Sequence, residues 1–253
     1  MNNKKQERLE LAERHTKYMS AQFNKKIQES YENTIIYDSN SVFSKNINKK
    51  NTEIILEPLT SSEAVEKYSK DEKTALLNFA SYKNPGGGFI KGSFAQEEAL
   101  CHDSFLYNVL INFLDSYYTW NREHLNNSLY LDRALYSPNI YFVLKNKTFV
   151  CDVITCAAPN KSAAIKCGIS NKENLNVLEK RLNFVFNIAK ENNVETLILG
   201  AWGCGVFGQN PKELASLYKK LLKTYTCFNK VVFAIPKDRF GNYDSFKEIL
   251  QDQ

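Results

Sequence analysis

Residues 74–98 read TALLNFASYKNPGGGFIKGSFAQEE, and this stretch carries the strongest structural signal in the chain. Its opening apolar run is typical of a buried strand. Pro85 ends the extended segment, and the glycines at 86–88 give a backbone that can approach a ligand with no side chain in the way. From Gln96 onward the apolar positions recur at helical spacing. The stretch therefore predicts a strand, a ligand-binding loop and a helix in succession.

Two adjacent carboxylates, Glu97 and Glu98, stand at the start of that helix. Acidic residues at a helix N-terminus often do no more than complement the helix dipole. Here they lie next to a triple glycine and accompany a second glycine-rich loop. The combination favours a role in ligand binding or catalysis.

The second glycine-rich loop follows another predicted strand, in residues 196–208, TLILGAWGCGVFG. Asn210 suits the cap of a following helix and Pro211 its first position. Backbone N–H groups of such a loop, together with a helix N-terminus, bind anions, so a phosphate or diphosphate is the predicted ligand. The spacing also matches the GxGxxG of dinucleotide-binding folds, although no acidic residue follows about twenty positions later. A Rossmann-type site is therefore kept as an alternative.

Short apolar runs alternate with helical segments along the rest of the chain. Strands are expected at 34–37, 53–56, 74–80, 140–144, 149–155, 196–199 and 231–235. Helices are expected at 62–68, 94–116, 172–192, 211–225 and 243–250. This alternation predicts an α/β domain with a mixed, mostly parallel sheet, in which ligands bind beyond the carboxyl ends of the strands.

Two further segments complete the organisation of the chain. Residues 1–32 are charged and carry a loose apolar stripe, so we expect an N-terminal helical extension that docks on a main domain over 33–253. Residues 117–136 are polar and aromatic, and we expect them to form a long insertion.

The composition narrows the class of protein. The 253 residues are 43% hydrophobic and 24% charged, which excludes a disordered or fibrous protein. The chain lacks the roughly 18 consecutive apolar residues of a membrane-spanning helix, and its start lacks the apolar core of a signal peptide. The net charge of +5 mildly favours an anionic ligand but is too dispersed for a nucleic-acid groove. We expect a cytoplasmic monomer without membrane contact or sequence-specific nucleic-acid binding.

The cysteines and histidines predict neither a disulfide framework nor a metal site. The six cysteines include no CxxC pair, so reduced thiols are expected. Three scattered histidines and these cysteines form no metal-ligand set, and no cofactor is expected. Cys204 is interpreted as a small residue that permits tight loop packing, because no histidine motif accompanies it as a nucleophile would require.

In these motifs the chain resembles the macrodomain superfamily, specifically the bacterial-type poly(ADP-ribose) glycohydrolases. That family's signature is a triple glycine, a short spacer and QEE, and here the spacer is seven residues long. The resemblance extends to LNFASYKNPGGG, to CDVITCAAPN at 151–160 and to LGAWGCGVFGQNP at 199–211, and so covers roughly residues 32–250. It implies a three-layer α/β/α macrodomain-like fold.

The resemblance also implies roles for individual residues. Glu98 corresponds to the catalytic acid, and Glu97 to the residue that holds a ribose hydroxyl. The implied substrate-binding residues are Asn84, Gly86, Gly87, Gly88, Gln96, Gly203, Cys204, Gly205, Val206, Phe207, Gly208 and Asn242. Among them Phe207 would cover the proximal ribose. Phe240 and Asn242 are the candidates for adenine contact, with a loop-closing or core role as the alternative.

The implied activity is hydrolysis of ribose–ribose bonds in poly(ADP-ribose), mainly from chain ends, with ADP-ribose as product. One alternative is a reader that binds ADP-ribose with little turnover, although binding alone needs the loops and not the paired acids. Another is a hydrolase of mono-ADP-ribosylated protein or nucleic acid. The implied partners are therefore ADP-ribose, its polymer and ADP-ribosylated macromolecules.

Overall fold

The computed structural model describes residues 2–45 and 49–251, and within them one seven-stranded sheet forms the centre of the molecule. The strand order is β1-β4-β5-β3-β6-β7-β2. Neighbours from β5 to β2 pair in parallel, whereas β4 is antiparallel to both β1 and β5. The strands are β1 Ile35–Asp38, β2 Glu53–Glu57, β3 Thr74–Phe79, β4 Arg133–Leu144, β5 Lys147–Cys156, β6 Thr196–Leu199 and β7 Lys230–Ala234. The predicted mixed, mostly parallel sheet is confirmed.

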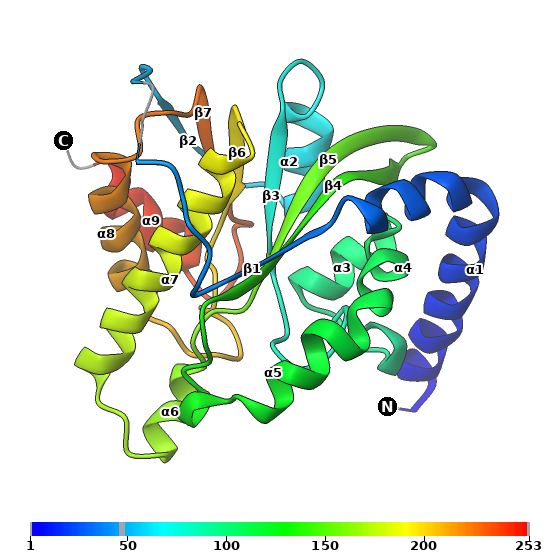
Figure 1. Ribbon diagram of the computed structural model, residues 1–253, viewed down its shortest axis with the longest axis horizontal. Helices are drawn as coiled ribbons and strands as arrows, with labels where there is room; N and C mark the ends of the chain where they lie inside the picture. The colour runs from blue at the N-terminus through cyan, green and yellow to red at the C-terminus, as the bar shows by residue number, and fades with distance from the viewer. Residues whose placement is uncertain (1, 46–48, 252–253) are drawn as a thin grey trace.

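Helices cover both faces of this sheet, which gives three layers (Figure 1). The helices are α1 Asn2–Glu32, α2 Ser61–Tyr68, α3 Gln96–Asp103, α4 Leu106–Leu110, α5 Trp120–Glu123, α6 Lys161–Lys166, α7 Asn171–Glu191, α8 Pro211–Leu222 and α9 Asn242–Gln251. One buried apolar cluster joins one face of the sheet to α7, α8 and α9. A second joins the other face to α1, α2, α3 and α4. The expected α/β/α architecture is therefore confirmed.

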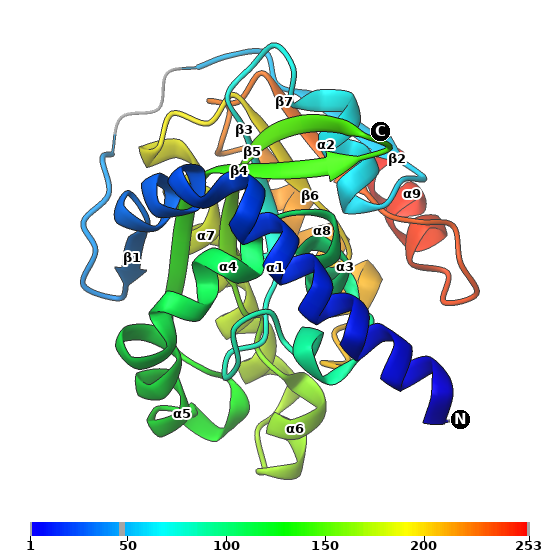
Figure 2. The same cartoon turned by 90° about the vertical axis from the view of Figure 1, so that its right-hand side faces the viewer.

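Helix α1 lies across the outside of the helical layer that contains α3 and α4 (Figure 2). Ala12 and Met19 on it are buried, and Asn108 of α4 donates a hydrogen bond to the carbonyl of Thr16. Near its start, Arg8 donates to the carbonyl of Gly92, in the loop that follows the triple glycine. The prediction of a docked helix is confirmed.

The helix predicted over 94–116 is wrong as a single element. It is broken at Ser104, whose extended backbone forms an isolated bridge with Phe142 of β4. The Ser104 hydroxyl donates to the carbonyl of Leu100 and accepts from the N–H of Leu106, so it serves the end of α3 and the start of α4. The run then continues through 3₁₀ and π turns into α5.

The strand predicted at 140–144 is more than twice as long in the structure, because β4 begins at Arg133 and continues through an irregularity. Pro138 cannot donate to the ladder and Asn139 has a positive φ of 55°, which interrupts the pairing between Ser137 and Ile140. The expected insertion over 117–136 is consequently wrong at its end, which is strand. Its remainder is packed structure, with Tyr117 and Tyr118 buried.

Among residues 2–45 and 49–251, no helix combines the length and apolar character needed to cross a membrane. All six cysteines fall inside these ranges, and each is a free thiol.

Candidate active site

The two glycine-rich loops meet at one edge of the sheet. Strands β3 and β6 are adjacent and parallel, so the loops that leave their carboxyl ends lie side by side. Between them is a cavity of about 290 Å³. Its lining includes Gly87, Glu97 and Glu98 from the first loop and helix α3, and Gly203, Gly205 and Phe207 from the second loop.

A larger cavity of about 560 Å³ adjoins the first. The two share Phe79, Ala95, Gln96 and Ala201 in their linings. The larger one extends past the end of β7, and its lining also includes Phe94, Asp103, Phe240 and Asn242. Phe94 and Phe240 are 66% and 68% exposed, so both present aromatic surface to a ligand. Together the cavities form an elongated site.

Glu98 is buried, and backbone N–H groups hold both of its carboxylate oxygens. The Gly88 N–H donates to Oε1 at 2.7 Å, and the Ala95 N–H donates to Oε2 at 2.8 Å. A carboxylate offers about four lone-pair positions, so each oxygen keeps one of them for a ligand. The glycine loop and the start of α3 therefore fix this group at the wall of the cavity.

Glu97 is more deeply buried, at 3% exposure. Its Oε2 accepts the Ser81 N–H at 2.6 Å, and its Oε1 accepts the Asn78 amide at 3.2 Å. Burial raises the pKa of Glu97 to about 8; the charge of Glu98 acts in the same direction, and the two donors oppose it. The two adjacent glutamates thus stand in different electrostatic surroundings.

Gln96 lines both cavities, but its amide is engaged by the protein. Its Oε1 accepts the Phe79 N–H at 2.8 Å, while its Nε2 donates to the Leu77 carbonyl and the Ser61 hydroxyl, each at 3.0 Å. The side chain therefore ties α3 to the end of β3 and the start of α2. This anchoring sets the direction from which the next two residues enter the cavity.

Gly87, in the first loop, lies where a side chain would collide with the two glutamates. Its φ of +61° lies in the left-handed region, and an added Cβ would lie 2.5 Å from Glu98 Oε1 and 2.9 Å from Glu97 Oε2. Asn84 starts the loop, where its carbonyl accepts the Gly87 N–H at 3.1 Å. Substitution at Gly87 would therefore displace both carboxylates as well as fill the ligand's space.

Gly205, in the second loop, has open surroundings, in contrast to Gly87. A Cβ there would meet no heavy atom within 4 Å among the described residues, and its φ lies outside the left-handed region. By contrast, an added Cβ on Gly203 would lie 2.9 Å from Ala158 and from Gln209. A side chain at Gly205 would therefore start in open space beside the cavity that this residue lines.

A buried pair of side-chain amides joins the end of the second loop to helix α7. Gln209 and Asn174 of α7 exchange two hydrogen bonds of 2.9 Å, and Gln209 Nε2 also donates to the Pro159 carbonyl at 2.8 Å. Trp202 is buried under the loop, as expected for a packing residue, and donates to the Cys156 carbonyl. These contacts join the loop to β5, to the segment that follows it and to α7.

Cys204 and Phe207 are the other two residues of the second loop whose surroundings bear on their roles. Burial raises the pKa of the Cys204 thiol to about 12, which does not suit a nucleophile and agrees with its interpretation as a packing residue. The Phe207 ring is half-buried and lies 6.1 Å from the ring of Tyr130. Tyr130 stacks in turn on Tyr82 at 4.2 Å, so aromatic side chains support this end of the cavity.

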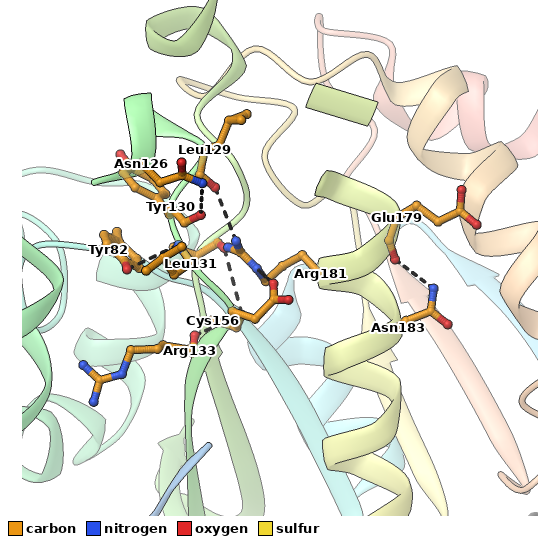
Figure 3. Close-up of polar contacts among 12 residues, drawn as sticks. Tyr82, Asn126, Leu129, Tyr130, Leu131, Arg133, Cys156, Glu179, Arg181 and Asn183 are labelled. Atoms are coloured by element: carbon orange, nitrogen blue, oxygen red, sulfur yellow. Dashed lines mark hydrogen bonds and ion pairs between the residues drawn. The ribbon is translucent and has the colours of Figure 1, made fainter. Parts of the chain in front are cut away.

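Arg181 of α7 is bonded to the segment that carries Tyr130 (Figure 3). Its guanidinium pairs with Asp132 and donates to the carbonyls of Ala157 and Leu129 at 2.8 and 3.3 Å. The sequence interpretation missed Arg181, as it missed Asn78, Asn174 and Gln209. A charged residue within the apolar stretch RLNFVF was the one available signal.

Glu97→Gln should gain stability relative to the wild type as the pH rises. The carboxyl titrates near 4.5 in the unfolded chain and at about 8 in the folded protein, so the contribution of Glu97 to stability is fully present below pH 4.5 and is lost as the pH rises to about 8. The loss is on the order of a few kcal/mol, and the Gln variant escapes it. Urea unfolding of both proteins at about pH 5 and about pH 8.5 measures this difference. A difference that does not change with pH would contradict the raised pKa.

Comparison with known proteins identifies the family of this chain. The chain matches the microbial-type PARG (poly(ADP-ribose) glycohydrolase) catalytic domain over residues 6–145, which is more than half its length. The poly(ADP-ribose) glycohydrolase of Thermomonospora curvata has a TM-score of 0.88 at 26% identity, with 96% of this chain and 99% of that chain covered. The same enzyme bound to the inhibitor ADP-HPD has a TM-score of 0.84.

A second solved relative comes from Deinococcus radiodurans. Its poly(ADP-ribose) glycohydrolase, crystallised in complex with ADP-ribose, has a TM-score of 0.80 at 30% identity, with 89% of this chain and 97% of that chain covered. No curated protein sequence matches the chain. The family match and the fold agree: the chain belongs to the microbial-type poly(ADP-ribose) glycohydrolases and is a glycohydrolase.

Proposed function

We propose that this enzyme hydrolyses the ribose–ribose O-glycosidic bonds of poly(ADP-ribose), mainly from chain ends, and releases ADP-ribose. The observation that carries the proposal is the placement of Glu98. Its carboxylate is fixed by the N–H groups of Gly88 and Ala95 at the wall of a cavity whose opposite wall is the loop at 203–208. A phosphate-binding loop and a buried acid thus face one another across a space of ligand size.

The two adjoining cavities suit the parts of ADP-ribose. The loop at 203–208 offers N–H groups to the diphosphate, and Phe207 covers the proximal ribose. The terminal ribose lies in the cavity beside Gly87 and the two glutamates, with Glu97 holding a hydroxyl. The larger cavity takes the adenine, with the exposed Phe240 ring available for stacking and Asn242 for hydrogen bonding.

A single carboxylate carries both proton transfers in this proposal. The bond breaks through an oxocarbenium-like state, and Glu98 protonates the departing ribose oxygen and then deprotonates the incoming water. Glycosidases normally divide these tasks between two carboxylates on opposite sides of the bond. Glu97 and Glu98 both lie against Gly87, on one side of the cavity. The substrate's own diphosphate therefore stabilises the developing positive charge.

The experiment that tests this function offers the enzyme two substrates in parallel. The first is a poly(ADP-ribose) chain of defined length and the second a mono-ADP-ribosylated protein, with products resolved by size. ADP-ribose released stepwise from the polymer supports the proposal. Release from the second substrate alone would assign the enzyme to mono-ADP-ribose, and tight ADP-ribose binding without turnover of either would make it a reader.

A further inference from the structure

Asn78 is a polar side chain at one of the most buried places in the sheet. It lies in β3, between β5 and β6, and has no exposed surface. Its register partner on β5 is Thr155, which is also fully buried, and the Asn78 amide donates to the Thr155 hydroxyl at 3.3 Å. An apolar pair would fill the same space without removing an amide and a hydroxyl from water. Packing alone therefore gives no reason for these two residues.

The same amide reaches the site. Asn78 Nδ2 also donates to Glu97 Oε1 at 3.2 Å, while the Ser81 N–H donates to Oε2 at 2.6 Å. Glu97 stands in the first turn of α3, whereas both donors belong to β3 and the residues just after it. These two hydrogen bonds therefore fix the carboxylate relative to the strand end, where the cavity lies.

The polar groups around Glu97 are incompletely satisfied by the protein. Asn78 Oδ1 and the Tyr118 hydroxyl are buried without a hydrogen-bond partner among the described residues. Tyr118 is close enough to Glu97 for the carboxylate to raise its pKa, in addition to the effect of burial. Unpaired buried polar groups cost stability, and such departures from good packing concentrate at functional sites.

We propose that Asn78, itself aligned by Thr155, is a positioning residue that aims Glu97 at the ribose in the cavity. The inference rests on the proposed function, in which Glu97 holds a ribose hydroxyl. Asn78 is absent from the lining of the cavity, whereas Glu97 is part of it. The Asn78 side chain therefore reaches the cavity through its hydrogen bond to Glu97.

The test replaces Asn78 with leucine, which has nearly the same size but no amide. We expect ADP-ribose affinity, measured by calorimetry, to weaken about tenfold, and kcat/KM on the polymer to fall at least as much. Because the amide N–H stabilises the carboxylate, its loss also raises the pKa of Glu97. The pH range over which Glu97 affects unfolding should therefore move upward. The variant leaves in place the other ionisable groups that face Glu97, which are Glu98, Cys101 and Tyr118.

A matched control is Asn108→Leu. Asn108 is also a buried amide with an unpaired Oδ1, but its Nδ2 donates to Thr16 and Ser20 of α1, away from the cavity. This variant should lose stability and keep wild-type affinity, kcat/KM and pH profile. In a Glu97→Ala background, Asn78→Leu should cause no further loss of ADP-ribose affinity.

Three outcomes would overturn the positioning role: an Asn78→Leu affinity within twofold of the wild type, an equal loss in the Asn108→Leu control, or a full additional loss in the Glu97→Ala background. If Asn78→Leu does not fold, Thr155→Val removes only the hydroxyl that aligns Asn78. It should weaken affinity a few-fold in the same direction, and no change would count against the proposal. The wild-type protein is measured alongside, so that failure of the proposed function can be told from failure of the positioning role. A wild type that binds ADP-ribose but hydrolyses no polymer contradicts the proposed function alone.

Discussion

Glu98→Gln should abolish hydrolysis while ADP-ribose still binds. The substitution removes the transferable proton from a reaction in which one carboxylate serves as both acid and base. General acid–base catalysis contributes about 10²–10⁴-fold, and we expect a loss of about 10³–10⁴-fold in kcat. Rates on poly(ADP-ribose) and ADP-ribose affinity should be measured on the same preparation. Near-normal turnover in this variant would remove Glu98 from its catalytic role.

The structure adds a stability cost to this expectation. Glu98 accepts an N–H at each oxygen, and a glutamine can accept only one of the two. The matched control is Glu63→Gln in α2, because Glu63 occupies the same helix position and also accepts the N–H of its cap residue, Thr60. Glu98→Gln should lose stability, on the order of 1–2 kcal/mol, and Glu63→Gln should lose less, because Glu63 accepts through Oε2 alone and a glutamine keeps one accepting oxygen. Only Glu98→Gln should lose activity.

Gly205→Val should abolish ADP-ribose binding without unfolding the protein. The branched side chain enters the space that the diphosphate needs, and its Cβ would meet no described heavy atom within 4 Å. Wild-type protein should gain about 2.7 kcal/mol at an ADP-ribose concentration 100 times its Kd, with far smaller gains from adenosine or NAD. The variant should show the same unliganded melting temperature and no gain.

Gly203→Val provides the contrast to this variant. Its φ of +76° and the close approach to Ala158 and Gln209 mean that this variant should lose stability as well as binding. A folded Gly205→Val protein with wild-type affinity would show that the phosphates bind elsewhere. An equal response of the wild type to NAD would instead favour the dinucleotide-binding alternative. Gly87→Val tests a different feature, because its side chain would displace Glu97 and Glu98 directly.

The sequence predicted the sheet and the position of the cavity because both depend on local patterns. Apolar runs at 74–80 and 196–199, each followed by glycines, correctly predicted two strands that end in loops, and the structure brings these loops together at one edge. The helix break at Ser104 was not predictable in this way, because it depends on a bridge to Phe142, far along the chain. Propensity favoured one continuous helix, and tertiary pairing overrode it.

Other features of the site depend on long-range contacts in the same way. Gln96 was expected to bind substrate, but its amide is occupied by β3 and α2. The hydrogen bonds between the amides of Asn174 and Gln209 join residues 35 positions apart. Isolated polar residues in apolar runs, such as Asn78 and Arg181, were visible in the sequence as exceptions, yet their partners became evident only in the fold.

The structure of Glu98→Gln bound to an intact dimer of ADP-ribose would test the account most directly. We expect the diphosphate of the terminal unit to lie on the N–H groups of the 203–208 loop and its ribose to contact Glu97. The glycosidic oxygen should lie within hydrogen-bonding distance of the side chain at position 98. Phosphates bound away from the 203–208 loop, or a glycosidic oxygen out of reach of position 98, would contradict the proposed mechanism.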